Sequence, residues 1–184
     1  MRTLPFVLLA LMVATTTAAC RSGNVKPSIP TAAPVDVDRF MGDWYVIAQI
    51  PTYIERKAFD SVESYRLDAD GKIRTTFRYR NGSADAPLKT MEPVGRVVPG
   101  TNNAVWEMQF VWPIQAEYVI VDLAPDYSRT IVGRSKRDYV WLMARTPSLP
   151  APELAAAIEK IRTLGYDTSK LRMVPQAAAN AAPP

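Results

Sequence analysis

The side chains that most often carry enzyme chemistry are almost missing from this chain of 184 residues. It contains no histidine and one cysteine, Cys20, which stands at the end of an apolar N-terminal run. Without histidine, a Ser-His-Asp triad, a histidine-ligated zinc or haem and most neutral-pH proton shuttles are excluded. Asp and Glu remain for acid and base catalysis, but no pair stands apart from ordinary surface charge. We therefore expect no enzyme activity, no metal and no cofactor.

The N-terminus has the pattern of a cleaved export signal. Arg2 precedes the apolar run Leu4–Val13, and Ala18 and Ala19 follow as the small residues of a cleavage site. The apolar run is too short to span a bilayer. We predict a signal peptide over residues 1–19.

Cys20 stands where bacterial lipoproteins are processed, and its surroundings resemble such a site, with Thr17 in place of the usual leucine. The resemblance implies acyl chains on Cys20, which at ~0.8 kcal/mol per buried CH2 would tether the protein to a membrane. Arg21 after the cysteine implies sorting to the outer membrane of a bacterial envelope, facing the periplasm. A plain secretory signal cleaved near Ala19, with an inert cysteine, is the alternative.

The middle of the chain has a dominant sequence period of two, which is typical of strands with one buried and one exposed face. The period is clearest in two runs of alternating residues, Ile73, Thr75, Phe77 and Tyr79, and then Ala104, Trp106, Met108 and Phe110. Turn signals such as Asp70-Gly71 and Asn81-Gly82 separate the runs at the spacing of an antiparallel meander. We predict eight strands before residue 146.

An amphipathic helix is predicted over Glu153–Leu164. It follows Pro150 and Pro152, stops at Gly165, and places on one stripe Leu154, Ala157, Ile158, Ile161 and Leu164. This stripe should cover the apolar outer surface of the last strands. Leu171–Val174 is then placed to pair as a short ninth strand.

The ends of the chain differ in composition from the middle. Residues 20–34 are predicted to hold the lipidated cysteine and a proline-rich, semi-extended linker. Residues 175–184, mostly Ala and Pro, are predicted to be a disordered tail. The domain itself is expected over residues 35–174. Its basic residues, which give a net charge of +4, are scattered rather than clustered, so nucleic acid is not expected as a partner.

Three segments in order resemble the lipocalins, and most closely the bacterial outer-membrane lipoprotein lipocalins: Gly42-Asp43-Trp44, Tyr118–Tyr127 and Arg137–Pro147. The resemblance implies an all-β fold, an eight-stranded antiparallel up-and-down barrel with one C-terminal α-helix packed on the outside. In relatives a tryptophan floors the barrel and an arginine stacks across it. Trp44 and Arg145 match these two positions, and Gly42 lets the backbone come close. These three residues are expected to be structural.

The resemblance also implies a barrel cavity for a lipophilic ligand, with an aromatic and aliphatic interior and few buried charges. Tyr118 and Trp141 match strand positions that face the cavity in relatives, and strand parity supplies the other candidates. The candidate ligand-binding residues are Val46, Ala48, Phe77, Phe110, Tyr118, Trp141 and Met143. For each of them, barrel core that touches no ligand is the alternative role.

Two loops are placed at the predicted mouth of the barrel. The loop of residues 52–59 has a charged tip, where Arg56 or Lys57 either pairs with an acidic headgroup or is simply solvated. Trp112, in the hairpin near the open end, is a candidate to gate the mouth, to form a dimer contact or to cap apolar surface.

Together with the N-terminal signal, the resemblance implies a membrane-tethered protein that binds and carries or stores a fatty acid, lysophospholipid or phospholipid for maintenance of the cell envelope. Its expected partners are the lipid ligand and the membrane that holds the anchor, and a homodimer stays open. Two alternatives remain. One is an envelope interaction module with a filled barrel and no ligand, and the other is a cofactor-free lipid-modifying enzyme.

Overall fold

A computed structural model describes residues 28–32 and 34–177 of the chain. The predicted signal peptide over residues 1–19, Cys20 and Arg21 lie outside the described residues. No helix among the described residues is long and apolar enough to cross a membrane.

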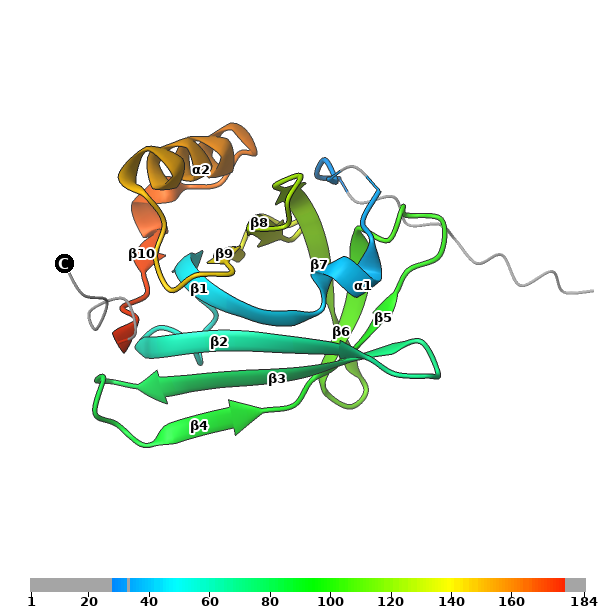
Figure 1. Ribbon diagram of the computed structural model, residues 1–184, viewed down its shortest axis with the longest axis horizontal. Helices are drawn as coiled ribbons and strands as arrows, with labels where there is room; N and C mark the ends of the chain where they lie inside the picture. The colour runs from blue at the N-terminus through cyan, green and yellow to red at the C-terminus, as the bar shows by residue number, and fades with distance from the viewer. Residues whose placement is uncertain (1–27, 33, 178–184) are drawn as a thin grey trace, which may run out of the picture.

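In the described part of the chain, ten antiparallel strands form one sheet that closes on itself (Figure 1). The strands are β1 (Gly42–Ile50), β2 (Ala58–Leu67), β3 (Lys72–Asn81), β4 (Leu88–Met91), β5 (Val94–Val97), β6 (Val105–Val111), β7 (Ile114–Leu123), β8 (Arg129–Gly133), β9 (Val140–Ala144) and β10 (Arg172–Met173). Strand β1 pairs with β2 on one side and β9 on the other, which closes the barrel. Strands β4 and β5 pair with successive parts of β3 and share one position, so nine strands occupy eight positions. The predicted eight-stranded antiparallel barrel is confirmed.

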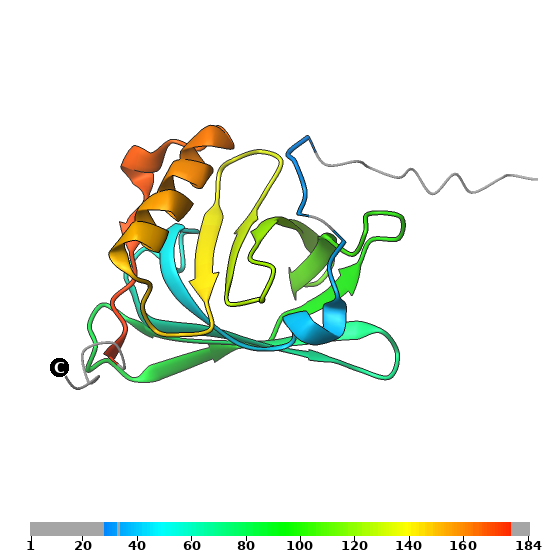
Figure 2. The same ribbon diagram turned by 45° about the horizontal axis from the view of Figure 1, so that its top comes forward.

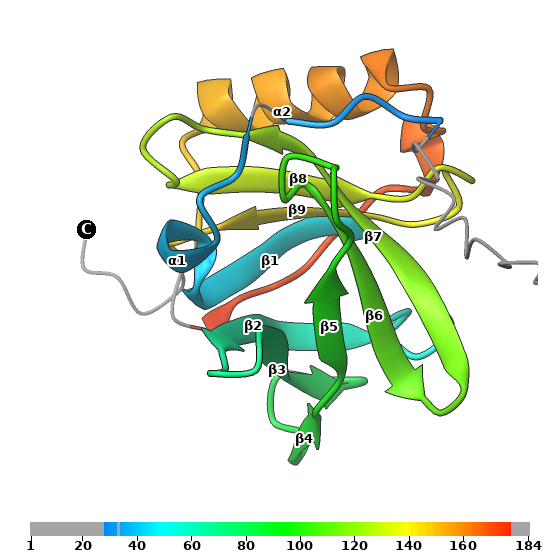
Figure 3. The ribbon, with the colours of Figure 1, turned by 90° about the vertical axis from the view of Figure 1, so that its right-hand side faces the viewer.

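Alternation along the strands builds the barrel wall. In β3 the side chains of Ile73, Thr75, Phe77 and Tyr79 are buried, and those between them are more exposed. The short helix α1 (Val37–Phe40) lies across one end of the barrel, the closed end, as Figure 3 shows. The opposite end carries the loops between β1 and β2, β3 and β4, β6 and β7, and β8 and β9.

Helix α2 (Ala151–Thr163) packs on the outside of the barrel (Figure 2), as predicted. Its Ala157 and Ile161 are buried against Leu142 and Ala144 of β9 in one apolar cluster. The helix ends before Gly165, whose φ of +89° favours glycine. After the 3-10 turn η1 (Thr168–Lys170), β10 pairs with β1, so the predicted ninth strand is confirmed.

The packed chain extends beyond the predicted domain limits at both ends. Ile29, placed in the linker, is buried in the cluster under α2, and the Ala32 N–H donates to the Ile120 carbonyl at 2.8 Å. At the other end, the buried amide of Gln176 donates to the carbonyls of Val46 (2.8 Å) and Ser61 (3.1 Å). Composition marked these segments as linker and tail because a single Ile or Gln carries no periodic signal.

Candidate functional site

The closed end of the barrel is sealed by Trp44 and Arg145, as the sequence predicts. The Arg145 guanidinium lies 3.8 Å from the centre of the Trp44 ring, and it donates to the carbonyls of Asp43 (2.8 Å), Arg39 (2.9 Å) and Phe40 (3.1 Å). The Trp44 indole N–H donates to the Phe40 carbonyl at 2.8 Å. The cation-π contact and the planar guanidinium fork together join α1, β1 and the end of β9.

Aromatic rings form the layer above this floor. Phe40 packs against Trp44 and Trp106, with ring centres 4.9 and 5.2 Å away. Trp106 stacks on Tyr118 at 5.1 Å with the ring planes 8° apart. The hydroxyls of Tyr118 and Tyr65 are hydrogen-bonded at 2.7 Å. This layer fills the half of the interior next to the closed end. The upper half, next to the open end, is the part in which space remains.

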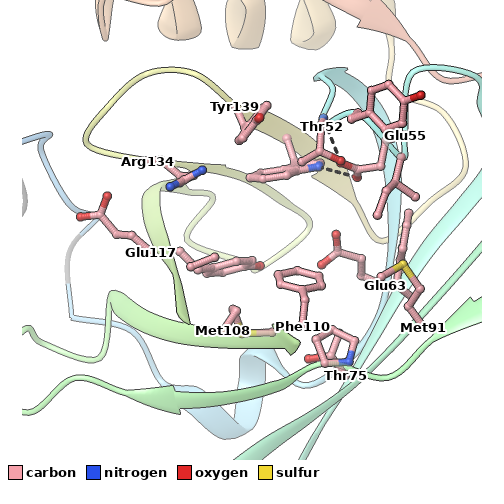
Figure 4. A pocket seen from close by; sticks show the side chains of 17 residues that line it. Thr52, Glu55, Glu63, Thr75, Met91, Met108, Phe110, Glu117, Arg134 and Tyr139 are labelled. Carbon is pink, nitrogen blue, oxygen red and sulfur yellow. Dashed lines mark hydrogen bonds between the residues drawn. The ribbon is translucent and has the colours of Figure 1, made fainter. Parts of the chain in front are cut away.

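A cavity of about 370 Å³ occupies the upper half of the barrel and opens between the loops (Figure 4). Its lining is mostly apolar and aromatic, which suits a small lipophilic ligand. The lining residues are Thr52, Tyr53, Ile54, Glu55, Glu63, Thr75, Phe77, Met91, Pro93, Met108, Phe110, Ala116, Glu117, Tyr118, Arg134, Tyr139 and Trp141. A second hollow, of about 630 Å³, is lined by charged side chains such as Arg66 and Asp68. Because its lining is polar, the apolar cavity is the better candidate for a lipophilic ligand.

Four of the seven candidate ligand-binding residues line this cavity: Phe77, Phe110, Tyr118 and Trp141. Val46 and Met143 do not line it, because they are fully buried in the cluster that contains Trp44 and Phe40. They belong to the floor, where the aromatic layer separates them from the open part of the interior.

Ala48 does not face the interior, so the strand-parity argument is wrong there. It pairs with Leu142 and packs with it in the cluster under α2. The pairing register of β1 and β9 shifts between Val46 and Ala48, and an extra residue at such a bulge reverses the alternation beyond it. Gln49 follows Ala48 and is paired with Trp141, a cavity residue.

The first loop turns one of its charges inward. Glu55 is only 6% exposed, whereas Arg56 and Lys57 are exposed as expected of a charged tip. The Glu55 carboxylate accepts hydrogen bonds from the backbone and hydroxyl of Thr52 and from the indole of Trp141 at 2.8 Å (Figure 4). These bonds hold the loop against the cavity wall.

A second carboxylate, Glu63 on β2, also lies in the cavity wall, where the Tyr65 hydroxyl donates to it. The pKa of Glu63 is raised to about 7. Burial of the carboxylate is the largest cause, the hydrogen bond from Tyr65 acts in the opposite direction, and the charge of Glu55 raises the pKa further. The sequence interpretation did not single out Glu63. Its two-residue spacing from Tyr65 was the available signal, but the alternation alone does not say which face is inside.

The expectation of few charges in the cavity is therefore wrong. Glu55, Glu63, Glu117 and Arg134 all line it. Glu117 accepts from the backbone and hydroxyl of Ser135, both at 2.7 Å, and Arg134 pairs with Asp138 at 3.2 Å. Glu55, Glu117 and Arg134 have polar partners at the loop end of the barrel, whereas the partner of Glu63 is Tyr65 in the aromatic layer.

Trp112 is 81% exposed in the turn between β6 and β7, two residues after Phe110 of the cavity wall. This places it at the open end, as predicted, and outside the cavity lining. Within the described ranges, no group of three or more acidic, cysteine or histidine side chains is placed to hold a metal ion.

Comparisons with known proteins agree with this architecture. Residues 35–176 match the family described as Lipocalin-like domain. The chain is 28% identical to the outer membrane lipoprotein Blc of Citrobacter freundii over 97% of this chain and all of that protein, and 26% identical to temperature-induced lipocalin-1 of Arabidopsis thaliana over 82% and 84% of the two chains. Among solved structures, insecticyanin from the tobacco hornworm Manduca sexta superposes with a TM-score of 0.64 at 18% identity, covering 83% of this chain and 87% of its own.

Proposed function

The chain belongs to the family of lipocalin-like domains, a family of small-hydrophobic-ligand binders, and from this membership we propose that it binds one lipid molecule in the barrel cavity and carries or stores it for maintenance of the cell envelope. The observation that carries this proposal is the cavity itself. It is enclosed by the floor of Trp44 and Arg145, lined mainly by apolar side chains and open at the loop end.

The size of the cavity supports a ligand with one hydrocarbon chain. Its volume of about 370 Å³ lies near the lower limit of roughly 300–1,000 Å³ for ligand pockets. A fatty acid or a lysophospholipid fits this limit better than a phospholipid with two chains buried at once. The flat rings of Phe77, Phe110 and Trp141 would then contact the chain along its length.

We also propose that the protein is tethered at the bacterial outer membrane through acyl chains on Cys20. The proposal rests on the apolar run before Cys20 in the sequence and on the similarity to proteins named outer membrane lipoprotein. Labelling of expressing bacteria with palmitate tests it. Label should enter the full chain and be lost in the Cys20→Ser variant, and an unlabelled full chain would contradict the tether.

Native mass spectrometry tests lipid binding. The mature chain from residue 20, with Cys20→Ser, is expressed in the bacterial cytoplasm and offered fatty acids and lysophospholipids. One lipid per chain is expected. Trp141→Ala should weaken the adduct because Trp141 lines the cavity, and Trp112→Ala, the same substitution outside the lining, should not. A folded protein that forms no adduct with any of these lipids would contradict the proposed function.

The alternative of an interaction module with a filled barrel has less support. A filled barrel requires side chains that occupy the upper interior, and here that space is a cavity. The exposed side chains of Tyr53, Trp112 and Ile114 favour some contact at the open end. Such a contact, including a homodimer, is compatible with ligand binding and does not replace it.

A further inference from the structure

The three carboxylates that line the cavity differ in how many hydrogen bonds they accept from the protein. Glu55 accepts from Thr52 and Trp141, and Glu117 accepts twice from Ser135. Glu63 differs from both. Within the described part of the chain it accepts one hydrogen bond, from the hydroxyl of Tyr65. An ionised carboxylate offers about four acceptor sites, so most of its capacity is free.

The aromatic layer below cannot supply more donors to Glu63. The single hydroxyl proton of Tyr65 is used for Glu63, and Tyr118 must then donate its own proton to the Tyr65 oxygen, 2.7 Å away. Figure 4 shows the Glu63 carboxylate projecting into the cavity between Phe110 and Glu55, with Glu117 on the far side. The free acceptor sites of Glu63 therefore face the space that a ligand would occupy.

A second polar group, diagonal to Glu63 on the neighbouring strand, has no hydrogen-bond partner among the described residues. Thr75 on β3 is 3% exposed and lines the cavity, and its hydroxyl has no hydrogen bond within the described residues. Thr75 pairs with Tyr65, and Glu63 pairs with Phe77, so Glu63 and Thr75 are diagonal neighbours across two strands. A buried hydroxyl without a protein partner is uncommon, and one that lines a cavity is available to bond a group that enters it.

We propose that Glu63 and Thr75 form a polar subsite for a hydrogen-bond-donating group, so that the cavity selects single-chain lipids with a hydroxyl or ammonium group and disfavours lipids with an ionised carboxylate. This inference rests on the proposed function and specifies its ligand class. A donor group satisfies Glu63, and Thr75 can donate to the ligand oxygen or accept from its N–H. A carboxylate group at this subsite would instead meet the like charges of Glu63 and Glu55, which are costly to bring together in an apolar cavity. The cation of the lining, Arg134, lies with Glu117 on the opposite side of the cavity and is paired with Asp138 at 3.2 Å (Figure 4).

Three probes with the same chain test this selection: dodecanol, dodecylamine and dodecanoate. Each is titrated at about pH 8.5 into the mature chain carrying Cys20→Ser, and dissociation constants are measured by calorimetry. We expect the alcohol and the amine to bind at least roughly tenfold more tightly than dodecanoate, the scale of one hydrogen bond to a charged group. Equal affinities for all three would overturn the subsite while leaving the proposed function intact. No binding of any probe would overturn both.

The variant Glu63→Gln removes the charge and keeps the shape of the side chain. The preference against dodecanoate should then fall by roughly tenfold, and the amine should lose affinity. Glu107→Gln makes the same change on an exposed side chain of β6 and should leave the order of affinities unchanged. An unchanged order in a folded Glu63→Gln protein, verified by near-ultraviolet circular dichroism, would overturn the assignment.

The wild-type protein gives a second test that does not depend on the folding of a variant. Dodecanoate affinity should fall between about pH 5.5 and pH 8.5, as Glu63 becomes ionised beside Glu55 and the tyrosines Tyr65 and Tyr118. Dodecanol affinity should stay constant or rise over the same range, since the alcohol donates to either form of the site. Parallel curves for the two probes would contradict the subsite.

Discussion

Trp141 donates its indole N–H to Oε1 of Glu55 at 2.8 Å, and this bond joins strand β9 to the loop between β1 and β2. The other oxygen of the same carboxylate accepts from Thr52. A residue that the sequence places at a charged loop tip is thereby turned inward, and the loop becomes part of the cavity wall. The mouth of the barrel is held by this contact between distant parts of the chain.

Removal of the indole donor should loosen the first loop. We expect Trp141→Phe to lower the free energy of unfolding by about 1–3 kcal/mol, the cost of one hydrogen bond to a buried charged acceptor, with faster amide exchange at Glu55. Urea denaturation and hydrogen exchange measure the two effects. Tyr53→Phe, on an exposed side chain of the same loop, is the control and should change neither. Equal stability of the Trp141→Phe protein and the wild type would show that the bond does not hold the loop.

The floor should depend on the guanidinium shape of residue 145 rather than on its charge. Arg145→Lys keeps the charge but cannot reach three carbonyls and stack on Trp44 together, so we expect a loss of roughly 2 kcal/mol in stability. Ligand affinity should be unchanged, because Arg145 lies at the closed end and does not line the cavity. Thermal unfolding and lipid titration measure both properties. A loss of affinity at unchanged stability would contradict a purely structural role, and Arg96→Lys, exposed on β5, serves as control.

Gly133 at the end of β8 lies under the ring of Tyr166. A Cβ atom at this position would come within 2.1 Å of the Tyr166 hydroxyl oxygen, which is itself bonded to the backbone N–H and carbonyl of Arg134. Gly133→Ala should destabilise the protein by about 1–3 kcal/mol through overpacking.

The double variant Gly133→Ala with Tyr166→Phe tests this cause. The double variant lacks the clashing hydroxyl. Its loss of stability should therefore be smaller than the sum of the losses measured for Gly133→Ala alone and Tyr166→Phe alone. Strictly additive effects in chemical denaturation would mean that the clash is not the reason.

Stability should fall as pH rises through the titration of Glu63. Burial raises the pKa of this group from 4.5 to about 7, so the folded state holds the proton more tightly than the unfolded state. The stabilisation is fully present at a pH below the Glu63 pKa of the unfolded state and is lost as the pH rises above the Glu63 pKa of the folded state. Relative to Glu63→Gln, the free energy of unfolding of the ligand-free protein should drop by up to about 3 kcal/mol between about pH 4.5 and pH 8. Denaturation curves across this range that run parallel for both proteins would contradict the raised pKa.

The sequence by itself determined the architecture and the floor. The period of two in β3, the apolar stripe of α2 and the Gly42-Asp43-Trp44 motif are local patterns, and local patterns follow directly from backbone geometry. The pairing of Trp44 with Arg145 was available through the resemblance to lipocalins, because the two residues occupy characteristic motifs. Strand alternation placed Phe77 and Phe110, and the resemblance to lipocalins placed Tyr118 and Trp141, on the wall that lines the cavity.

Only the tertiary structure decided the chemistry of the cavity. The bulge after Val46 turned Ala48 outward, and no residue type in that stretch predicts a shift of pairing register. Glu55 and Glu63 face the interior because Trp141, Thr52 and Tyr65 supply donors from β9, the first loop and the barrel wall. A single charged residue in an alternating run carries no sign of such partners. Burial of a charge depends on what surrounds it in space, and period and composition describe only what surrounds it along the chain.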